Sequence, residues 1–328
     1  MSLDITAAPT DAGLSDAGPM LDGWTAAQTR RFQSEIMTFR HRLAETGLFT
    51  DDALIDLLAR HPAEQLDVCT MGATDHPLYP NRFRTGDFRG VSPAGLLAAA
   101  QAGCVWINVR NAMNIHADYR AVLERMYGEL AEATGNRAYN PKGSLLISSP
   151  VARVPYHFDK TEVILWHVRG RKTIRAWPVT QDFIPDTAHE AKLTNLLDDD
   201  LPYCERFEAD ATPLRLEPGD GATWPLNAPH RVDNETFCVS VTTEYSTPES
   251  ATKNAAMMTN AALRRFAGLN PLYERDGAIA RRAKSLAGRL IRRTPLAAKA
   301  HEVDLVTFRI DPDVDGYLVD VAPFERDF

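Results

Sequence analysis

The spacing of apolar residues changes twice along the chain. Residues 24–66 place apolar side chains three and four positions apart, as in an amphipathic helix: Phe32, Ile36, Phe39 and Leu43. We expect this helix to end at Gly47 and a second helix to follow in "DDALIDLLARH". Two further helices are expected in "SPAGLLAAAQAG" and "ADYRAVLERMYGELAEATG", with the strand "CVWINVR" between them.

From Gly143 to Tyr245 the chain consists of short β-rich runs separated by Pro, Gly, Asn and Asp. The candidate strands are "SLLISS", "VPYHFD", "EVILWHV", "KTIRAWP", "PLRLEPG", "GATWPL" and "FCVSVTTEY". This pattern predicts an antiparallel sandwich or barrel. After Pro248 the pattern is helical to about Arg293, and "EVDLVTFRIDPDVDGYLVDV" predicts one or two closing strands. The expected fold class is therefore mainly β with flanking helices.

Composition narrows the class of protein. The formal charge of −8 over 328 residues argues against a general nucleic-acid binder. No apolar run approaches the roughly 20 residues of a membrane span. The cysteines are far apart and predict buried thiols in a reducing compartment: Cys69, Cys104, Cys204 and Cys238. The acidic start lacks the features of a secretory signal, so we expect a cytoplasmic protein.

The same patterns divide the chain into four parts. Residues 1–23 are expected to form a disordered tail, and residues 24–142 a helical region with leading strands. Residues 143–248 form the expected catalytic core, and residues 249–328 a helical region with closing strands.

The stretch "VPYHFDKTEVILWHVRGRK" places two ligand-type side chains in an apolar run. Residues two apart in a strand project to the same face, so His157 and Asp159 are expected to point together. The best third ligand is His230, which follows His157 by 230 − 157 = 73 residues. Two histidines and one carboxylate form the facial triad of non-haem Fe(II) oxygenases. An isolated H-x-D is usually accidental, but the β-rich setting and the later histidine favour a metal site.

These residues belong to a longer set of motifs that resembles the JmjC-type, cupin-fold 2-oxoglutarate oxygenases, and among them the protein hydroxylases such as asparaginyl hydroxylases. The resemblance covers roughly residues 143–245. It rests on His157-Phe158-Asp159, Gly170-Arg171-Lys172, Pro218-Gly219-Asp220, and Pro225 before His230. "RGRK" is expected to form a hairpin turn that returns the chain with Lys172.

The resemblance implies a double-stranded β-helix (jelly-roll) core and an Fe(II) site made by His157, Asp159 and His230. It also implies that Lys172 pairs with the far carboxylate of 2-oxoglutarate. The implied reaction hydroxylates a protein, peptide or amino-acid-like substrate, with succinate and CO2 as co-products. Val154 and Val163 stand where relatives often carry a hydroxyl residue and an asparagine. Other residues could therefore donate hydrogen bonds to the 2-oxoglutarate carboxylate, and the sequence does not choose among the candidates Ser148, Tyr139, Asn108, Thr161 and Thr242.

Other interpretations compete with this one. The chain could be a catalytically silent cupin used as a binding or regulatory module, or a metal-dependent small-molecule enzyme that does not use 2-oxoglutarate. The latter usually shows H-x-H with a later glutamate, whereas residue 159 is aspartate. His167 is expected in the core or behind the ligands. Three tryptophans either line the cavity or pack in the core: Trp166, Trp177 and Trp224.

The basic segment near the C-terminus also allows two interpretations. It is either a docking surface for an acidic partner or nucleic acid, or a solvated helix with one apolar face packed inward. The second is favoured, with the inward residues being Ile279, Leu286, Leu290 and Ile291. Because related hydroxylases dimerise through C-terminal helices, the resemblance also makes this segment a candidate homodimer interface.

Overall fold

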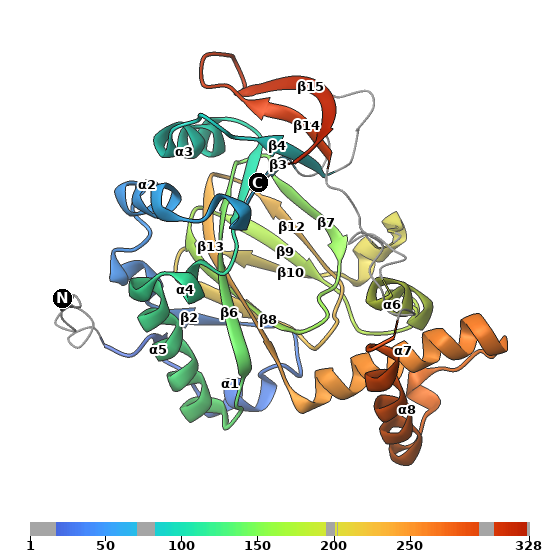
Figure 1. Ribbon diagram of the computed structural model, residues 1–328. Coiled ribbons are helices and arrows are strands. Elements are labelled where there is room, and N and C mark those ends of the chain that lie inside the picture. The colour runs from blue at the N-terminus through green and yellow to red at the C-terminus, as the bar shows by residue number, and fades with distance from the viewer. Residues whose placement is uncertain (1–17, 71–82, 195–200, 202, 295–304, 327–328) are drawn as a thin grey trace, which may run out of the picture.

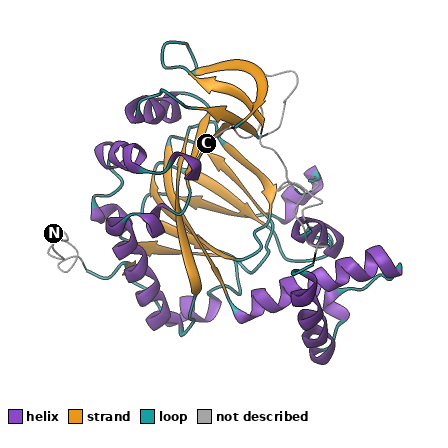
Figure 2. Ribbon diagram, in the orientation of Figure 1, coloured by secondary structure: helices purple, strands orange, loops and turns teal. Residues whose placement is uncertain are grey.

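The computed structural model describes residues 18–70, 83–194, 201, 203–294 and 305–326. Two β-sheets pack face to face, and helices cover the outside of the larger sheet (Figures 1 and 2). The space between the sheets is filled by an apolar cluster to which both contribute. Val163 and Leu165 come from the large sheet, and Ile174 and Leu216 from the small one.

The large sheet contains, in spatial order, β1 (Leu21–Asp22), β2 (Met37–His41), β11 (Asp220–Thr223), β8 (Glu162–Arg169), β13 (Cys238–Ser246), β6 (Tyr139–Ser148), β5 (Val105–Val109), β3 (Leu66–Thr70), β4 (Arg84–Asp87), β14 (Leu305–Ile310) and β15 (Leu318–Glu325). The small sheet contains β10 (Thr212–Leu216), β9 (Lys172–Ala176), β12 (His230–Asn234) and β7 (Arg153–His157).

The eight strands from β6 to β13 form a double-stranded β-helix. The chain passes from one sheet to the other at every step except between β9 and β10, which pair within the small sheet. The result is two antiparallel four-stranded layers, β6-β13-β8-β11 and β7-β12-β9-β10. This order confirms the predicted jelly-roll core with helical additions.

The described helices are α1 (Ala26–Arg31), α2 (Asp51–Arg60), α3 (Pro93–Ala102), α4 (Ala112–Ile115), α5 (Ala117–Thr134), α6 (Asp186–Leu193), α7 (Pro248–Ala267) and α8 (Ala278–Ile291). Thr50, Ser92 and Thr247 cap α2, α3 and α7, each accepting a backbone N–H of the first turn. The predicted helices at α2, α3 and α5 are therefore confirmed. Their apolar faces pack on the outside of the large sheet in the main core.

The long helix predicted from Trp24 to Gly47 is wrong. In that stretch only the six residues of α1 are α-helical, and Phe39 lies in β2, which pairs with β11. Along β2, Met37, Phe39 and His41 are buried while the residues between them are exposed. The alternation of "MTFRH" fits a strand equally well, and pairing with the sheet decides between the two.

The N-terminal tail prediction is wrong for its last residues. Leu21–Asp22 form β1, and the backbone N–H groups of Met20 and Leu21 each donate to the Glu129 carboxylate at 2.8 Å. Residues 1–17 lie outside the described residues.

Two further expectations about the core need correction. "RGRK" is not a hairpin turn, because β8 and β9 lie in different sheets and the chain crosses between them at Gly170, with φ +85°. The sequence also missed β12, whose "HRVDN" lacks an apolar run. Pairing with β7 and β9 on both sides makes it a strand.

The thiol prediction holds only in part. All four cysteines are free, and Cys69 and Cys238 are buried, but Cys104 is half-buried and Cys204 is exposed. Within the described part of the chain, no helix combines the length and apolar character that crossing a bilayer requires.

The C-terminal helices pack against each other but not as expected. Gly288 of α8 lies so close to α7 that a Cβ atom there would stand 1.7 Å from the Ala255 carbonyl oxygen. The opposite face of α8 is open: Ile279, Leu286 and Leu290 are 86%, 63% and 65% exposed. The inward packing predicted for these residues is therefore wrong, because the glycine side of α8 faces α7.

Candidate metal centre

His157, Asp159 and His230 meet where β7 ends and β12 begins. One ligand atom from each lies within 4.8 Å of the others. The two histidines are opposite one another in the register of β7 and β12, and their ring centroids are 4.2 Å apart. His230 Nε2 lies 3.4 Å from Asp159 Oδ2. Two strands and the segment after β7 thus bring together the three residues that the sequence singled out.

Hydrogen bonds fix which nitrogen of each ring is free. His157 Nδ1 lies 2.8 Å from the Pro155 carbonyl oxygen, and His230 Nδ1 lies 3.1 Å from that of Ala228. A carbonyl can only accept, so Nδ1 carries a proton in both rings, and in the neutral form of each ring the lone pair is on Nε2. Burial, with the neighbouring His157, lowers the pKa of His230 to about 3. A neutral imidazole of this tautomer suits a metal ligand, and the donor set fits Fe(II).

The three tryptophans divide between core and site. The Trp224 ring lies 4.3 Å from the ring of His230, centroid to centroid, and restricts its rotation. Trp166 packs in the main core, and Trp177 packs beside Tyr156 in a smaller cluster. Only Trp224 therefore contacts a candidate ligand. His167 is fully buried between Ser240 and the Gly170 carbonyl, which confirms its expected core position.

Lys172 projects into the space between the sheets. It lies two residues before Ile174 on β9, and Ile174 belongs to the inter-sheet cluster. Across β12, Ala176 pairs with His230 and Lys172 pairs with Asn234, so four residues, or about 13 Å of strand, separate Lys172 from the metal ligands. Lys172 is only 3% exposed, and burial lowers its pKa. Within the described residues, its ammonium has no hydrogen-bond or ion-pair partner.

The five further donors lie in different places. Thr242 pairs with Leu165, and Ser148 lies two residues from Leu146, so both face the inter-sheet space. Tyr139 is exposed, Asn108 donates to Asp67 at 3.4 Å, and Thr161 donates to Glu244 at 3.5 Å. The structure thus favours Thr242 and Ser148 by position.

Two polar residues near the triad, Asn227 and Glu244, were missed by sequence reasoning. Asn227 donates to the Asp159 carbonyl oxygen at 2.8 Å, and Glu244 accepts from Thr161 at 3.5 Å. Partial desolvation and the nearby Asp159 charge raise the pKa of the Glu244 carboxyl. Part of the Glu244 side chain nevertheless reaches solvent. Glu244 could have been identified from the sequence, because it lies two residues after the inward-facing Thr242 on the same strand. Asn227 could not, because its distinguishing feature is a left-handed backbone with φ 65°, which the sequence does not reveal.

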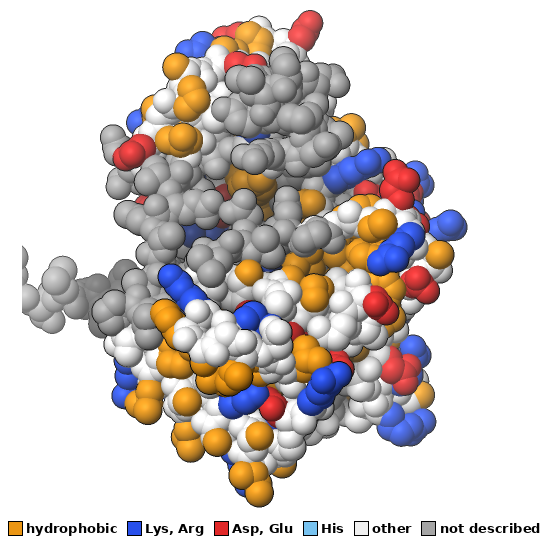
Figure 3. Space-filling model, turned by 90° about the vertical axis from the view of Figure 1, so that its right-hand side faces the viewer, with side chains coloured by type: hydrophobic (Ala, Val, Ile, Leu, Met, Phe, Trp, Pro, Cys, Tyr) orange, Lys and Arg blue, Asp and Glu red, His pale blue; other side chains and the backbone are white. Residues whose placement is uncertain are grey.

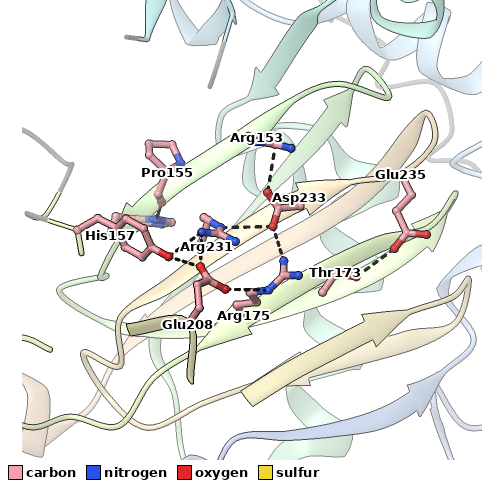
Figure 4. A network of polar contacts seen from close by, with 10 residues as sticks. Arg153, Pro155, His157, Thr173, Arg175, Glu208, Arg231, Asp233 and Glu235 are labelled. Atoms are coloured by element: carbon pink, nitrogen blue, oxygen red, sulfur yellow. Dashed lines mark hydrogen bonds and ion pairs between the residues drawn. The ribbon is translucent and has the colours of Figure 1, made fainter. Parts of the chain in front are cut away.

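A groove of about 710 Å³ lies on the other face of the small sheet. Figure 4 shows the charged network beside it, in which Arg175 and Arg153 reach Asp233 at 2.6 and 3.4 Å. Arg231 reaches Glu208 at 2.7 Å. Because these charges neutralise one another and none faces the triad, the groove is a weaker candidate than the metal centre.

Comparison with known proteins gives distant matches only. No protein-family model matches the chain, and no curated protein does. Among solved structures, it is similar to the ribosomal oxygenase YcfD from Escherichia coli in complex with cobalt and 2-oxoglutarate. The two share 15% identity over 88% of this chain and 74% of that chain, with a TM-score of 0.47. A complex of the same protein with cobalt and succinic acid shares 14% identity over the same fractions, at a TM-score of 0.43.

A further structure of YcfD shares 16% identity over 85% of this chain and 72% of that chain, with a TM-score of 0.46. We therefore base the proposed function on the chain's own strands and side chains.

Proposed function

We propose that the chain is a cytoplasmic Fe(II)- and 2-oxoglutarate-dependent oxygenase that hydroxylates a protein, peptide or amino-acid-like substrate. One observation supports this most directly. A three-ligand site with two histidines and a carboxylate shares the inter-sheet space with a buried lysine that has no described partner. Three protein ligands leave positions for other ligands on the metal, and an unpaired buried cation calls for an anion.

In this function, His157, Asp159 and His230 would each supply one ligand to the metal. His157 and His230 offer Nε2 lone pairs, and Asp159 supplies the negative charge that favours a divalent cation. The bound Fe(II) and 2-oxoglutarate supply the activation of dioxygen and the oxidising power for hydroxylation. Trp224 holds the His230 ring in place.

Lys172 is the proposed partner of the distal carboxylate of 2-oxoglutarate. Ile174 and Val232 lie between Lys172 and the histidines along β9 and β12, and both are in or against the apolar cluster. These side chains exclude water from the path, which strengthens the attraction between the ammonium and the carboxylate. A dicarboxylate bound at both ends is thereby oriented with its keto acid toward the triad.

Anaerobic titration tests this proposal. Fe(II)-loaded protein should develop a weak visible charge-transfer band as 2-oxoglutarate is added, and in air should form succinate. Lys172→Met should need far more 2-oxoglutarate for the same band. Metal binding without any band or succinate would contradict the oxygenase and favour a silent metal-binding cupin.

For the oligomer, we infer that a second copy covers the open face of α8. Ile279, Leu286 and Leu290 form one stripe along the helix, spaced seven and four residues apart. Figure 3 shows hydrophobic side chains among basic ones on the side of the molecule that carries α7 and α8. Exposed apolar stripes of this kind are typical of association surfaces.

A further inference from the structure

The segment Phe158–Lys160, which carries Asp159, is tied by side chains from three separate elements. The ammonium of Lys192, on α6, donates to the Phe158 carbonyl oxygen. Asn227, in the loop between β11 and β12, donates to the Asp159 carbonyl oxygen at 2.8 Å. Asn254, on α7, donates to the Lys160 carbonyl oxygen at 2.6 Å. Three consecutive backbone carbonyls thus accept from three side chains.

These side-chain hydrogen bonds hold a segment that lacks the backbone pairing of a β-sheet. β7 ends at His157 and β8 begins at Glu162, so Asp159 lies on a connection outside both strands. A ligand on such a connection has no regular backbone pairing to fix its direction. Holding the carbonyls on both sides of Asp159, and its own, fixes the backbone dihedrals that aim its carboxylate.

The donors are themselves held in place. Asn227 is buried and has φ 65°, a left-handed conformation that asparagine tolerates better than most residues. His189 Nε2 lies 3.3 Å from Asn254 Oδ1, which turns the amide nitrogen toward Lys160. Lys192 is buried, and its ammonium also lies 4.7 Å from the Phe158 ring centroid. Each donor is therefore oriented before a metal binds.

We propose that Asn227 and Asn254, assisted by Lys192, are positioning residues that hold the Asp159 carboxylate against the two histidines. The inference rests on the proposed metal centre. It also links that centre to α7, which packs against the helix bearing the apolar stripe. None of the three touches the metal-ligating atoms; they act through the backbone of Asp159.

Two variants remove the bonds with little change elsewhere. Asn227→Gly removes the donor and keeps a backbone that accepts φ 65° without strain. Asn254→Asp keeps the shape but replaces the donor by an acceptor. Asn260→Ala is the matched control, because Asn260 is buried on the same helix and contacts Met257 instead of the metal segment.

The measurement is a titration of the full chain with Co(II), followed by the visible absorption of the bound ion, with thermal unfolding of each metal-free variant alongside. Asn227→Gly and Asn254→Asp should weaken Co(II) binding by about 10-fold or more, as loss of a partner behind a metal ligand does, and should change the band shape. Asn260→Ala should keep the wild-type Co(II) affinity and absorption band even if the substitution lowers the thermal stability of the protein.

Wild-type Co(II) affinity and band shape in both metal-segment variants would overturn the positioning role. An equal loss in Asn260→Ala would also overturn it, because general packing of α7 would then explain the effect. Co(II) binding that survives Asp159→Ala would remove the metal centre itself, and the positioning role with it.

Discussion

His157 and His230 lie directly opposite one another in neighbouring antiparallel strands, and each ring donates from Nδ1 to a carbonyl two residues before it in the chain. The same local arrangement, repeated on two strands, leaves two Nε2 atoms facing one point. A carboxylate oxygen of Asp159 lies within 4.8 Å of the ligand atoms of both histidines, so it is placed to complete the proposed metal site.

Removing Asp159 should therefore disable metal binding. For Asp159→Ala, the affinity for Fe(II) should fall by more than the roughly 10–100-fold produced by losing an outer partner of a ligand. Anaerobic equilibrium dialysis against Fe(II) measures this. Asp233→Ala is the control, since Asp233 is a strand carboxylate on the other face of the small sheet. Equal affinities in Asp159→Ala and wild type would contradict the assigned ligand.

Lys172→Met should stabilise the free protein while weakening 2-oxoglutarate binding. A buried ammonium without a partner is unfavourable, and an apolar side chain of similar length should raise the free energy of unfolding by about 1 to 3 kcal/mol. Loss of the charged hydrogen bond should raise the Kd for 2-oxoglutarate at least about 10-fold. Urea unfolding and calorimetric titration measure the two effects. A variant that is destabilised, or that binds 2-oxoglutarate as wild type does, would argue against an anion site at Lys172.

Stability should fall as the pH is lowered below about 6.5. Burial lowers the pKa of His41 from 6.5 to about 4, with Arg40 adding to the effect. Between about pH 6.5 and pH 4, His41 is therefore protonated in the unfolded chain but not in the folded chain. The loss from this residue alone should reach about 3 kcal/mol between pH 7 and pH 4.

His41→Asn tests this point, because its amide oxygen can replace Nδ1 as acceptor for the Leu43 N–H. Plots of unfolding free energy against pH should be shallower in the variant by about 1.2 kcal/mol per pH unit near pH 5. Parallel plots for variant and wild type would show that His41 titrates normally. Burial also lowers the pKa of His167 and of His189 to about 3. Both residues therefore contribute to the pH dependence of stability in the variant as well as in the wild type.

Leu286→Ser should shift the protein from dimer to monomer at micromolar concentration. The substitution removes a 63%-exposed apolar side chain from the middle of the α8 stripe, without disturbing the contact of Gly288 with α7. Sedimentation velocity measures the shift, and Arg289→Ser, an exposed neighbour on the same helix, is the control. A wild-type protein that sediments as a monomer would contradict a second copy on this face.

The sequence by itself identified the residues of the candidate metal site. His157, Asp159 and His230 were identifiable because ligand-type residues stand out against apolar strands, and Lys172 because a lysine occurs at the interval typical of the resembling family. The alternation of apolar residues was enough to predict most core strands, since one face of each must be buried. Helices α2, α3 and α5 were identifiable from their own caps and spacing.

Tertiary structure decided everything that depends on a distant partner. β12 has no strand pattern of its own and exists because β7 and β9 supply hydrogen bonds on both edges. "MTFRH" is a strand because β11 pairs with it, and α8 turns Leu286 outward because Gly288 admits α7 closely. The ties of Asn227 and Asn254 to the Asp159 segment span 68 and 94 residues of chain. Local patterns carry no information about such contacts, because their free energy appears only when the chain has folded.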